Sequence, residues 1–528
     1  MTVRPEPEVS LLHDLLDRAA ARWPGRTALV SGPVSGTFGE LRDASLAAET
    51  GLRRAGVRRG DRVVVVIDEF TDAIAVMFGA SRLGAVYVLM NGDTTGYAAG
   101  HVLRDCAPVL VVAGGDTEAR RCAEALGLPI AHLPCFTAPP PRDGPLEPVP
   151  YAARPVSWDL VSVLYTSGST GRPKGVAGTH ANMVFAAQMI ARRLRLREDD
   201  VIGCVLPLAF DYGVYQILLS MLSGCALVWG KGTDAGPGLL AFLDRHRVTV
   251  LPSVPGLAHN LDRLSRRTPH ALPPLRVLTN TGAAMSADLL GRLRASYPDL
   301  GVYLMFGLTE CKRISILLPE ELPHKPDSVG RPLDDTECVI VDADGRPLPP
   351  GELGELVVRG PHVTLGYWGD PERTALRFRA WGPFGERALF TGDQCWLDED
   401  GYLYFHGRDD DIYKSNGFRV SATEVAMAAE EVPGVQEAFC VGARGDEPPV
   451  LAVVTELTAL RVRTELQKHL EWFKVPDLIV PVERLPLNRN GKVAPEAVRA
   501  LGKAVATPGK PAGGFGKTES LDDAGRSV

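Results

Sequence analysis

The chain has 528 residues, of which 45% are hydrophobic and 23% charged, and its formal net charge is −7. This length exceeds what one hydrophobic core supports, so we expect two or three globular domains. The acidic balance gives no electrostatic reason to expect nucleic acid or an anionic membrane as a partner. The nine cysteines form no CxxC pair, no apolar run is as long as a membrane span, and the first residues lack a signal-peptide core, so we expect a cytoplasmic protein.

Two helices are predicted near the start of the chain. Leucines at helical spacing predict a helix over 11–23, with Ser10 as its N-cap. Thr37 and Glu40 have capping-box spacing, which predicts a second helix that ends near Ala55.

Apolar runs alternate with helical segments along most of the chain. The first of these runs is apolar at every position, as in a parallel strand that is covered on both faces. This alternation is typical of βαβ units and predicts mostly parallel sheets. Together with a helix at 181–194, we expect strands at 63–67, 85–90, 108–113, 160–164, 200–208, 225–229, 248–254, 275–282 and 302–307.

Changes in composition suggest where the domains meet. Prolines crowd into 134–155, which we interpret as a stiff surface connection between sub-domains. Short strands separated by Gly, Pro and Asp turns predict a β-rich sub-domain near 330–408, which would complete an N-terminal domain at 1–408. A small mobile C-terminal domain at 409–503 would follow, and then a disordered tail at 504–528.

A stretch rich in hydroxyl groups and glycines follows the strand at 160–164. Small residues let the backbone approach a ligand closely, and N–H groups with hydroxyls form a concavity suited to phosphate. The stretch is not a P-loop, because Pro173 and Gly175 flank its lysine where that motif needs Gly and then Ser or Thr. A flexible linker would not explain the strand before it and the Pro-Lys-Gly-Val sequence after it. The residues expected to contact phosphate are Thr166, Ser167, Gly168, Ser169, Thr170, Gly171 and Lys174.

This stretch resembles the signature loop of the adenylate-forming superfamily, which comprises acyl- and aryl-CoA synthetases, peptide-synthetase adenylation domains and luciferases. Four ordered motifs carry the resemblance over roughly residues 10–500. It implies an α/β fold with a large N-terminal domain of two mostly parallel βα sub-domains plus a β-rich sub-domain. A small mobile α+β C-terminal domain would follow.

The second motif combines an aromatic residue, a glycine, a threonine and a glutamate at a predicted strand end, where α/β proteins bind ligands. Alone, it could be a strand that ends in a solvated glutamate. An aromatic ring can stack on a base, and a carboxylate can hold Mg²⁺ against phosphate oxygens. The resemblance implies that Phe306 contacts adenine, Thr309 contacts the α-phosphate and Glu310 binds Mg²⁺. It also places Gly282 and Ala283 against the adenine.

The third and fourth motifs lie in the C-terminal third of the chain. A buried aspartate can accept hydrogen bonds from both ribose hydroxyls, with an arginine beside it. The resemblance assigns this role to Asp393 and Arg408, and it makes Asp410 the hinge of the C-terminal domain. Lys492 would ordinarily be read as an exposed turn residue. The resemblance implies that it neutralises charge in the pentavalent transition state of adenylation.

The expected acid-binding pocket departs from the common pattern of the superfamily. In peptide-synthetase domains a carboxylate at the position of Asp211 pairs with the substrate α-ammonium, which points to an amine-bearing acid. Arg313 resembles a pocket position that is usually small or apolar, and a buried arginine needs a partner. Either Arg313 pairs with Asp211 and closes the ammonium site, or it holds a second acidic group of the substrate. The expected pocket residues are Asp211, Tyr212, Tyr215, Thr281 and Arg313, of which the two tyrosines would exclude long fatty chains.

The motifs together predict a ligase that uses ATP and Mg²⁺ to convert a small polar, amino or aryl acid to an acyl-adenylate. The acyl group would pass to a thiol of CoA or of a free-standing carrier protein. Two alternatives stay open: transfer to an amine or another non-thiol nucleophile, and a nucleotide-binding protein without activity. A dinucleotide-dependent oxidoreductase, suggested by the glycines at 230–235, lacks a catalytic constellation, so we interpret that segment as a turn.

Overall fold

The computed structural model describes residues 9–67, 69–92, 94, 96–136, 150, 153–166, 173–268, 272–282, 284–408, 412–415, 418–444, 447–468, 470, 474–488 and 491–506. The chain divides into two compact units, of which the larger contains residues 1–409 and 489–492. Most of the proline-rich connection and nearly all of the expected disordered tail lie outside the described residues.

A nine-stranded sheet in the large unit contains the strands expected between 200 and 307. Its strands are β1 (Thr27–Ser31), β2 (Val34–Thr37), β9 (Val201–Cys204), β10 (Ala226–Trp229), β11 (Val250–Ser253), β12 (Val277–Asn280), β13 (Gly301–Phe306), β14 (Ser315–Leu317) and β15 (Arg331–Pro332). They lie in the order β15-β14-β13-β12-β11-β9-β10-β1-β2. The six strands from β13 to β1 in this order are parallel, while β2, β14 and β15 each pair antiparallel with the strand before them in the chain.

A seven-stranded sheet contains the earlier predicted strands. Its strands are β3 (Arg62–Ile67), β4 (Val86–Asn91), β5 (Leu110–Val112), β6 (Ile130–Ala131), β7 (Leu160–Thr166), β8 (Lys174–Thr179) and β18 (Gly366–Tyr367). The order is β18-β8-β7-β4-β3-β5-β6, with β8 and β18 antiparallel to their neighbours. Strand β8 was not among the predicted strands.

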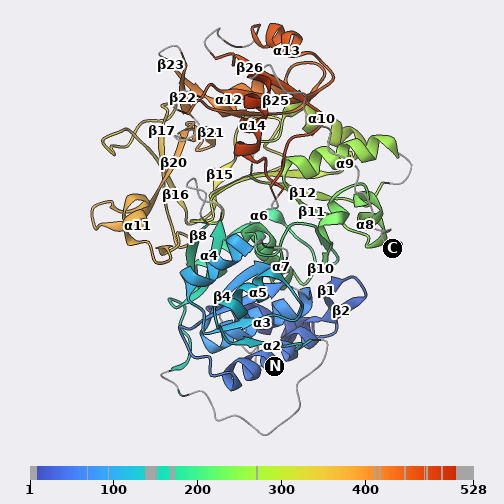
Figure 1. Ribbon diagram of the computed structural model, residues 1–528, viewed down its shortest axis with the longest axis vertical. Helices are drawn as coiled ribbons and strands as arrows, with labels where there is room; N and C mark the ends of the chain where they lie inside the picture. Colours follow the sequence, from blue (N-terminus) through green and yellow to red (C-terminus); the bar gives the residue numbers. More distant parts are fainter. Residues whose placement is uncertain are drawn as a thin grey trace, which may run out of the picture. The chain divides into compact units, whose positions relative to one another are not determined.

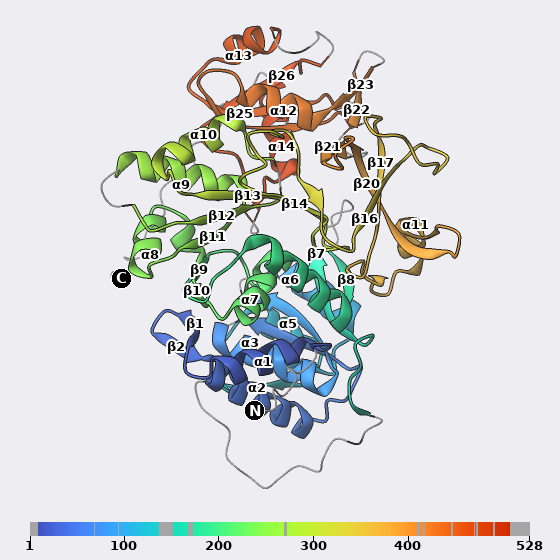
Figure 2. The same cartoon turned by 180° about the vertical axis from the view of Figure 1, so that it is seen from behind.

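Side-chain alternation along the strands divides the seven-stranded sheet between two cores. Val63 and Val65 of β3 join a core that also contains residues of the nine-stranded sheet, whereas Val64 and Val66 belong to a cluster with residues of helices α4 and α5. Figure 1 shows both helices beside this sheet. Helix α3 contacts strands of both sheets and is buried along nearly its whole length, so it lies between them. Helices α6 and α7 pack side by side in the same core (Figure 2). The helices of this unit are α1 (Leu12–Arg22), α2 (Phe38–Arg54), α3 (Phe70–Leu83), α4 (Gly96–Cys106), α5 (Glu118–Ala125), α6 (His180–Leu194), α7 (Asp211–Ser223), α8 (Leu239–Arg245), α9 (Pro255–Arg267), α10 (Ala287–Ser296) and α11 (Pro371–Arg377).

The two predicted helix starts have different outcomes. Glu40 accepts a hydrogen bond from the backbone N–H of Thr37, and the Thr37 hydroxyl accepts one from the N–H of Glu40, so the predicted capping box is present. The prediction of Ser10 as an N-cap was wrong, because Leu11 occupies that position. The Asp14 carboxylate, in the first turn, accepts hydrogen bonds from the N–H groups of Ser10 and Leu11, just before the helix.

The β-rich sub-domain is a five-stranded antiparallel sheet. It consists of β16 (Glu337–Val341), β17 (Gly354–Arg359), β19 (Phe378–Trp381), β20 (Glu386–Leu397) and β21 (Leu403–Arg408). The segment at 230–235 contains a short 3₁₀-helix, Gly232–Ala235, so no dinucleotide-binding helix begins there.

The small unit contains both helices and strands and has hydrophobic clusters of its own. Its elements are β22 (Ile412–Ser415), β23 (Phe418–Ser421), α12 (Ala422–Glu430), β24 (Val435–Val441), β25 (Val450–Thr455), α13 (Ala459–Leu466), β26 (Leu478–Val482) and α14 (Pro495–Ala506). The predicted α/β fold class is confirmed. No helix in the described parts of either unit is long and apolar enough to cross a membrane.

Candidate functional site

The stretch expected to bind phosphate lies between two antiparallel strands in the chain. Thr166, at the end of β7, lies opposite Lys174, at the start of β8. The His101 ring lies 2.9 Å from the carbonyl oxygen of Pro173, next to Lys174. The predicted phosphate contacts Ser167, Gly168, Ser169, Thr170 and Gly171 lie outside the described residues.

Lys174 and Glu310 come from different sheets and meet at this edge. The Lys174 Nζ atom lies 2.6 Å from Oε1 of Glu310. The hydroxyl of Tyr367, in β18, donates a hydrogen bond of 2.7 Å to the same oxygen. Burial alone would raise the pKa of Glu310, but the Lys174 ammonium and the Tyr367 hydroxyl hold it below its usual value. Glu310 is therefore an ionised carboxylate inside a nearly closed environment.

A tight turn carries Glu310 and the residues after it. Lys312 has a left-handed backbone with φ of 64°. A Cβ atom on Gly307 would lie 2.5 Å from the Lys312 carbonyl oxygen, so only glycine fits at that position. Thr364 stabilises the turn, because its N–H and hydroxyl both donate hydrogen bonds to the carbonyl oxygen of Glu310. Thr309 is half-buried beside Glu310.

Asp393 and Arg408 face each other across strands β20 and β21. The Arg408 Nε atom donates a 2.8 Å hydrogen bond to Oδ1 of Asp393. The side chain of Asp393 is 1% exposed, and its Oδ2 atom has no hydrogen-bond partner among the described residues. Burial raises the pKa of Asp393 to about 6, against the opposing effect of Arg408. A buried acceptor with a free oxygen suits a ligand that carries hydroxyl groups.

The remaining predicted nucleotide residues lie at two places in the large unit. The half-buried ring of Phe306 lies 5.3 Å from that of Phe405, measured between centroids. Gly282 has φ of 94°, and a Cβ atom there would lie 3.4 Å from Cε of Lys492. The Lys492 Nζ atom lies 5.3 Å from the ring centroid of Phe210. The predicted residues Ala283 and Asp410 lie outside the described residues.

The predicted pocket residues surround the buried side chain of Arg313. The guanidinium donates a 2.6 Å hydrogen bond to the hydroxyl of Thr281 and lies 5.6 Å from the ring centroid of Tyr212. The Tyr212 hydroxyl is bonded to Thr279, whereas the buried hydroxyl of Tyr215 has no partner in the described part of the chain. Arg313 is not within ion-pair distance of Asp211, at the start of α7, so this structure lacks the pairing that would close the ammonium site.

Lys312 is a pocket residue that the sequence reasoning missed. It is 4% exposed, and its Nζ atom lacks a hydrogen-bond partner among the described residues, as does Nε of Arg313. Burial lowers the pKa of both side chains, and the Asp211 carboxylate opposes that effect in each case. Two buried cations therefore lie near one carboxylate, with polar atoms left to bind a ligand. The signal was present in the sequence, since Lys312 directly precedes Arg313.

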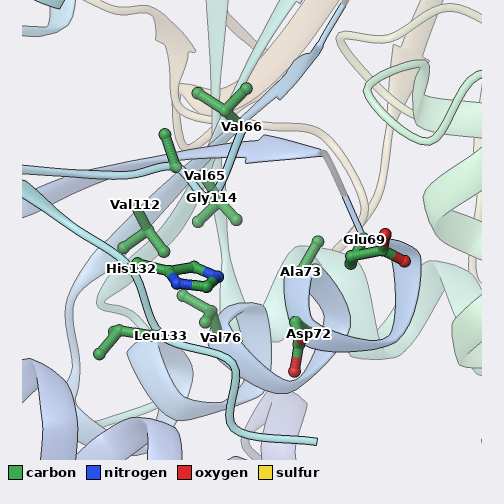
Figure 3. A pocket seen from close by; sticks show the side chains of 11 residues that line it. Val65, Val66, Glu69, Asp72, Ala73, Val76, Val112, Gly114, His132 and Leu133 are labelled. Atoms are coloured by element: carbon green, nitrogen blue, oxygen red, sulfur yellow. The ribbon is translucent and has the colours of Figure 1, made fainter. Parts of the chain in front are cut away.

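Two cavities lie away from these residues. A cavity of about 40 Å³ lies beside α3, and its lining includes Val66, Ala73 and His132 (Figure 3). This volume is enough for water but not for a nucleotide. A second, open hollow of about 540 Å³ lies at the N-terminal ends of β12 and β13. Neither cavity is lined by any of the predicted site residues that the structure describes.

Two family models match the chain. The model described as AMP-binding enzyme matches residues 16–368, and the model described as AMP-binding enzyme C-terminal domain matches residues 424–492. Together they include the strands and turns that carry most of the site residues described above.

Similar proteins include peptide synthetases and CoA ligases. The probable non-canonical nonribosomal peptide synthetase CymA of Salinispora arenicola is 32% identical over 92% of this chain, which spans only 6% of CymA. Feruloyl-CoA synthase of an Amycolatopsis species is 30% identical, with 91% of this chain and 97% of that protein covered. The chain spans less than half of the length of the first curated relatives that it matches. The structure of VinN in complex with L-aspartate is 36% identical, with a TM-score of 0.66, and covers 75% of this chain and 98% of VinN.

Proposed function

The chain belongs to the AMP-binding enzyme family of adenylate-forming ligases, and we propose that it activates a small amino acid carrying a second acidic group. The superfamily and the class of AMP-forming ligase predicted from the motifs are thereby confirmed. The proposed reaction forms an acyl-adenylate and pyrophosphate from the acid and ATP. The acyl group then passes to a thiol of CoA or of a carrier protein.

The described residues fit a nucleotide and one divalent cation. The orphaned Oδ2 atom of Asp393 is a ready acceptor for a ribose hydroxyl, and Lys174 supplies a cation for phosphate. The described residues contain no cluster of three or more His, Cys, Asp or Glu side chains that could hold a metal. Mg²⁺ is usually held by one or two carboxylates together with substrate phosphates, and the single carboxylate of Glu310 fits that pattern. A bound Mg²⁺ would neutralise charge on the phosphate oxygens.

The two buried cations carry the proposal for the acid. Lys312 and Arg313 each keep a buried polar atom without a partner in the described residues, which is costly unless a ligand completes the bonding. A carboxylate is the ligand that suits both side chains best, since it can accept bonds from each. Asp211 supplies the opposite charge, which suits an ammonium group on the same molecule. The L-aspartate bound to the similar VinN has this combination of groups.

The size of the pocket and the reaction at the carboxylate follow from neighbouring residues. Tyr212 and Tyr215 are buried aromatic side chains beside Arg313, and they leave little room for a long acyl chain. Lys492 groups with the large unit, beside Phe210 and Gly282. In the proposed reaction its ammonium offsets the negative charge that develops at the α-phosphate.

Pyrophosphate exchange with paired acids tests the proposal. Aspartate, a close homologue with the same groups, asparagine, alanine, an aryl acid and a fatty acid would be compared, each with and without CoA. We expect exchange with the amino dicarboxylic acids and little with asparagine, which has the same shape without the second charge. Arg313→Met and Lys312→Met should each lower kcat/KM for the acidic substrate by roughly 10- to 100-fold, the range for hydrogen bonds to charged groups.

The control is Arg193→Met, which removes a partly buried arginine that bonds to Asp334 and the carbonyl of Pro332. It should leave the exchange rate unchanged. Equal exchange with aspartate and asparagine, or an unchanged preference in both pocket variants, would contradict the assignment of Lys312 and Arg313. Consumption of CoA with the preferred acid would identify the thiol acceptor.

A further inference from the structure

Tyr367 shares one oxygen of Glu310 with Lys174. The phenol hydroxyl lies 2.7 Å from Oε1, and the Lys174 ammonium lies 2.6 Å from the same atom. The two donors are 3.3 Å apart, and the ammonium is also 4.7 Å from the centroid of the Tyr367 ring. These three side chains form one buried cluster between the two sheets of the large unit.

Backbone and ring contacts fix the Tyr367 side chain more firmly than the long Lys174 side chain is fixed. Its strand β18 pairs with β8, which begins at Lys174, and Tyr367 lies opposite Val176. The N–H of Tyr367 donates a hydrogen bond to the hydroxyl of Thr374, and the Phe378 ring packs edge-on against its ring. The phenol is therefore a fixed donor, whereas Lys174 ends a flexible chain of four methylene groups.

In the proposed reaction, Glu310 loses the hydrogen bond from Lys174 when the nucleotide binds. Lys174 cannot remain on the carboxylate while it also binds a nucleotide phosphate, because its ammonium is a single point charge. Without a second donor, the carboxylate would be free to rotate within its cavity. We infer that Tyr367 is a positioning residue, whose hydroxyl keeps hold of Oε1 and so directs the other oxygen of Glu310 toward a nucleotide-bound divalent cation. This inference rests on the proposed nucleotide and cation site.

The Tyr367→Phe variant tests the inference, since it keeps the ring and its packing but removes the hydroxyl. Mn²⁺ would replace Mg²⁺ as a probe, titrated by electron paramagnetic resonance in the presence of a non-hydrolysable ATP analogue. We expect the variant to bind Mn²⁺ roughly tenfold more weakly, as for loss of a hydrogen bond to a charged group. Its affinity for the analogue without metal should change much less, because the ring beside Lys174 is kept and Lys174 turns from the phenol to the phosphate when the analogue binds.

Tyr402→Phe is the matched control. The Tyr402 hydroxyl donates a 3.0 Å hydrogen bond to Glu321, and the Lys325 ammonium lies 4.8 Å from its ring centroid. Tyr402 therefore makes the same kinds of contact as Tyr367, but away from the proposed site. This variant should bind Mn²⁺ like the unmodified protein. Equal Mn²⁺ affinity in Tyr367→Phe and the unmodified protein would overturn the inference. Absence of analogue and Mn²⁺ binding by the unmodified protein would instead overturn the proposed function.

A second variant covers loss of folding. If Tyr367→Phe does not fold, the same change would be made together with Glu310→Ala, which removes the oxygen that the phenol contacts. The inference requires the double variant to melt at the same temperature as Glu310→Ala alone, because the hydroxyl then has no carboxylate to hold. A further large drop would show that the hydroxyl supports the fold independently of Glu310, and would overturn the inference.

Discussion

Replacing Asp393 by Asn should stabilise the nucleotide-free protein while it weakens nucleotide binding. The carboxylate is buried, and its pKa is raised from the usual 3.8 to about 6, so the ionised form is disfavoured in the folded state. Asn has nearly the same shape and keeps an oxygen for Arg408, but it never carries the charge. The stability of the unmodified protein should therefore fall, relative to the variant, as the pH rises through the interval between these two values.

The size of the effect follows from the two pKa values. Each pH unit between them is worth about 1.4 kcal/mol, so the advantage of the variant in unfolding free energy should grow from about 0.5 kcal/mol at pH 4 to about 1.6 kcal/mol at pH 5. It should level off near about 3 kcal/mol at pH 7. For a unit of this size, that difference corresponds to a melting temperature higher by roughly 3–4 °C.

Thermal melting of both proteins from pH 4 to pH 8 measures this directly. Effects of other titrating groups cancel, because only the difference between the two proteins at each pH is used. AMP binding by the same samples, measured by calorimetry, should be weaker in the Asn variant. Parallel melting profiles would refute the reasoning, since they would mean that residue 393 carries no destabilising charge. Unchanged AMP affinity would refute the ribose role alone.

Three other predictions rest on single contacts. AMP affinity of the unmodified protein should rise as the pH increases through about 6 and level off above about 7, because ionised Asp393 is the better acceptor; a flat calorimetric profile would contradict this. Thr37→Ala removes the N-cap of α2 and should cost about 1 kcal/mol of unfolding free energy in chemical denaturation, whereas Thr50→Ala, in the body of that helix, should cost less. Gly307→Ala forces a Cβ against the Lys312 carbonyl, and should lower pyrophosphate exchange and the preference for acidic substrates together, unlike Gly291→Ala, where a Cβ meets open space.

The strands and the order of the motifs were predictable because they depend on local patterns. The apolar runs that predicted β3 and β9 to β13 reflect burial on both faces, which the sequence records residue by residue. The capping box at Thr37 likewise needs only four consecutive residues. Ser10 failed as a cap because the helix begins at Leu12, which leaves Leu11 in the N-cap position.

Contacts between distant segments were not predictable in this way. Tyr367 sits in a two-residue strand, and nothing in its neighbourhood indicates that its hydroxyl reaches Glu310 from another sheet. Lys312 was visible beside Arg313, but its burial depends on a left-handed backbone that lysine seldom adopts. The resemblance assigned roles to residues that lie in a known motif. The structure adds Tyr367 and Lys312, for which no motif had assigned a role.

The pairing of β1 with β10 sets a condition on how this protein can fold. Leu29 lies beside Leu227 in parallel register, so the two strands are separated by roughly 200 residues of chain. During synthesis, β1 and its hairpin partner β2 have no sheet to join until β10 has left the ribosome. A chain that lacks β1 and β2 would leave β10 as an open edge strand. Its unpaired backbone groups would then favour aggregation. Strands β1 and β2 therefore cover the edge of the nine-stranded sheet, and shortened versions of the protein should keep them.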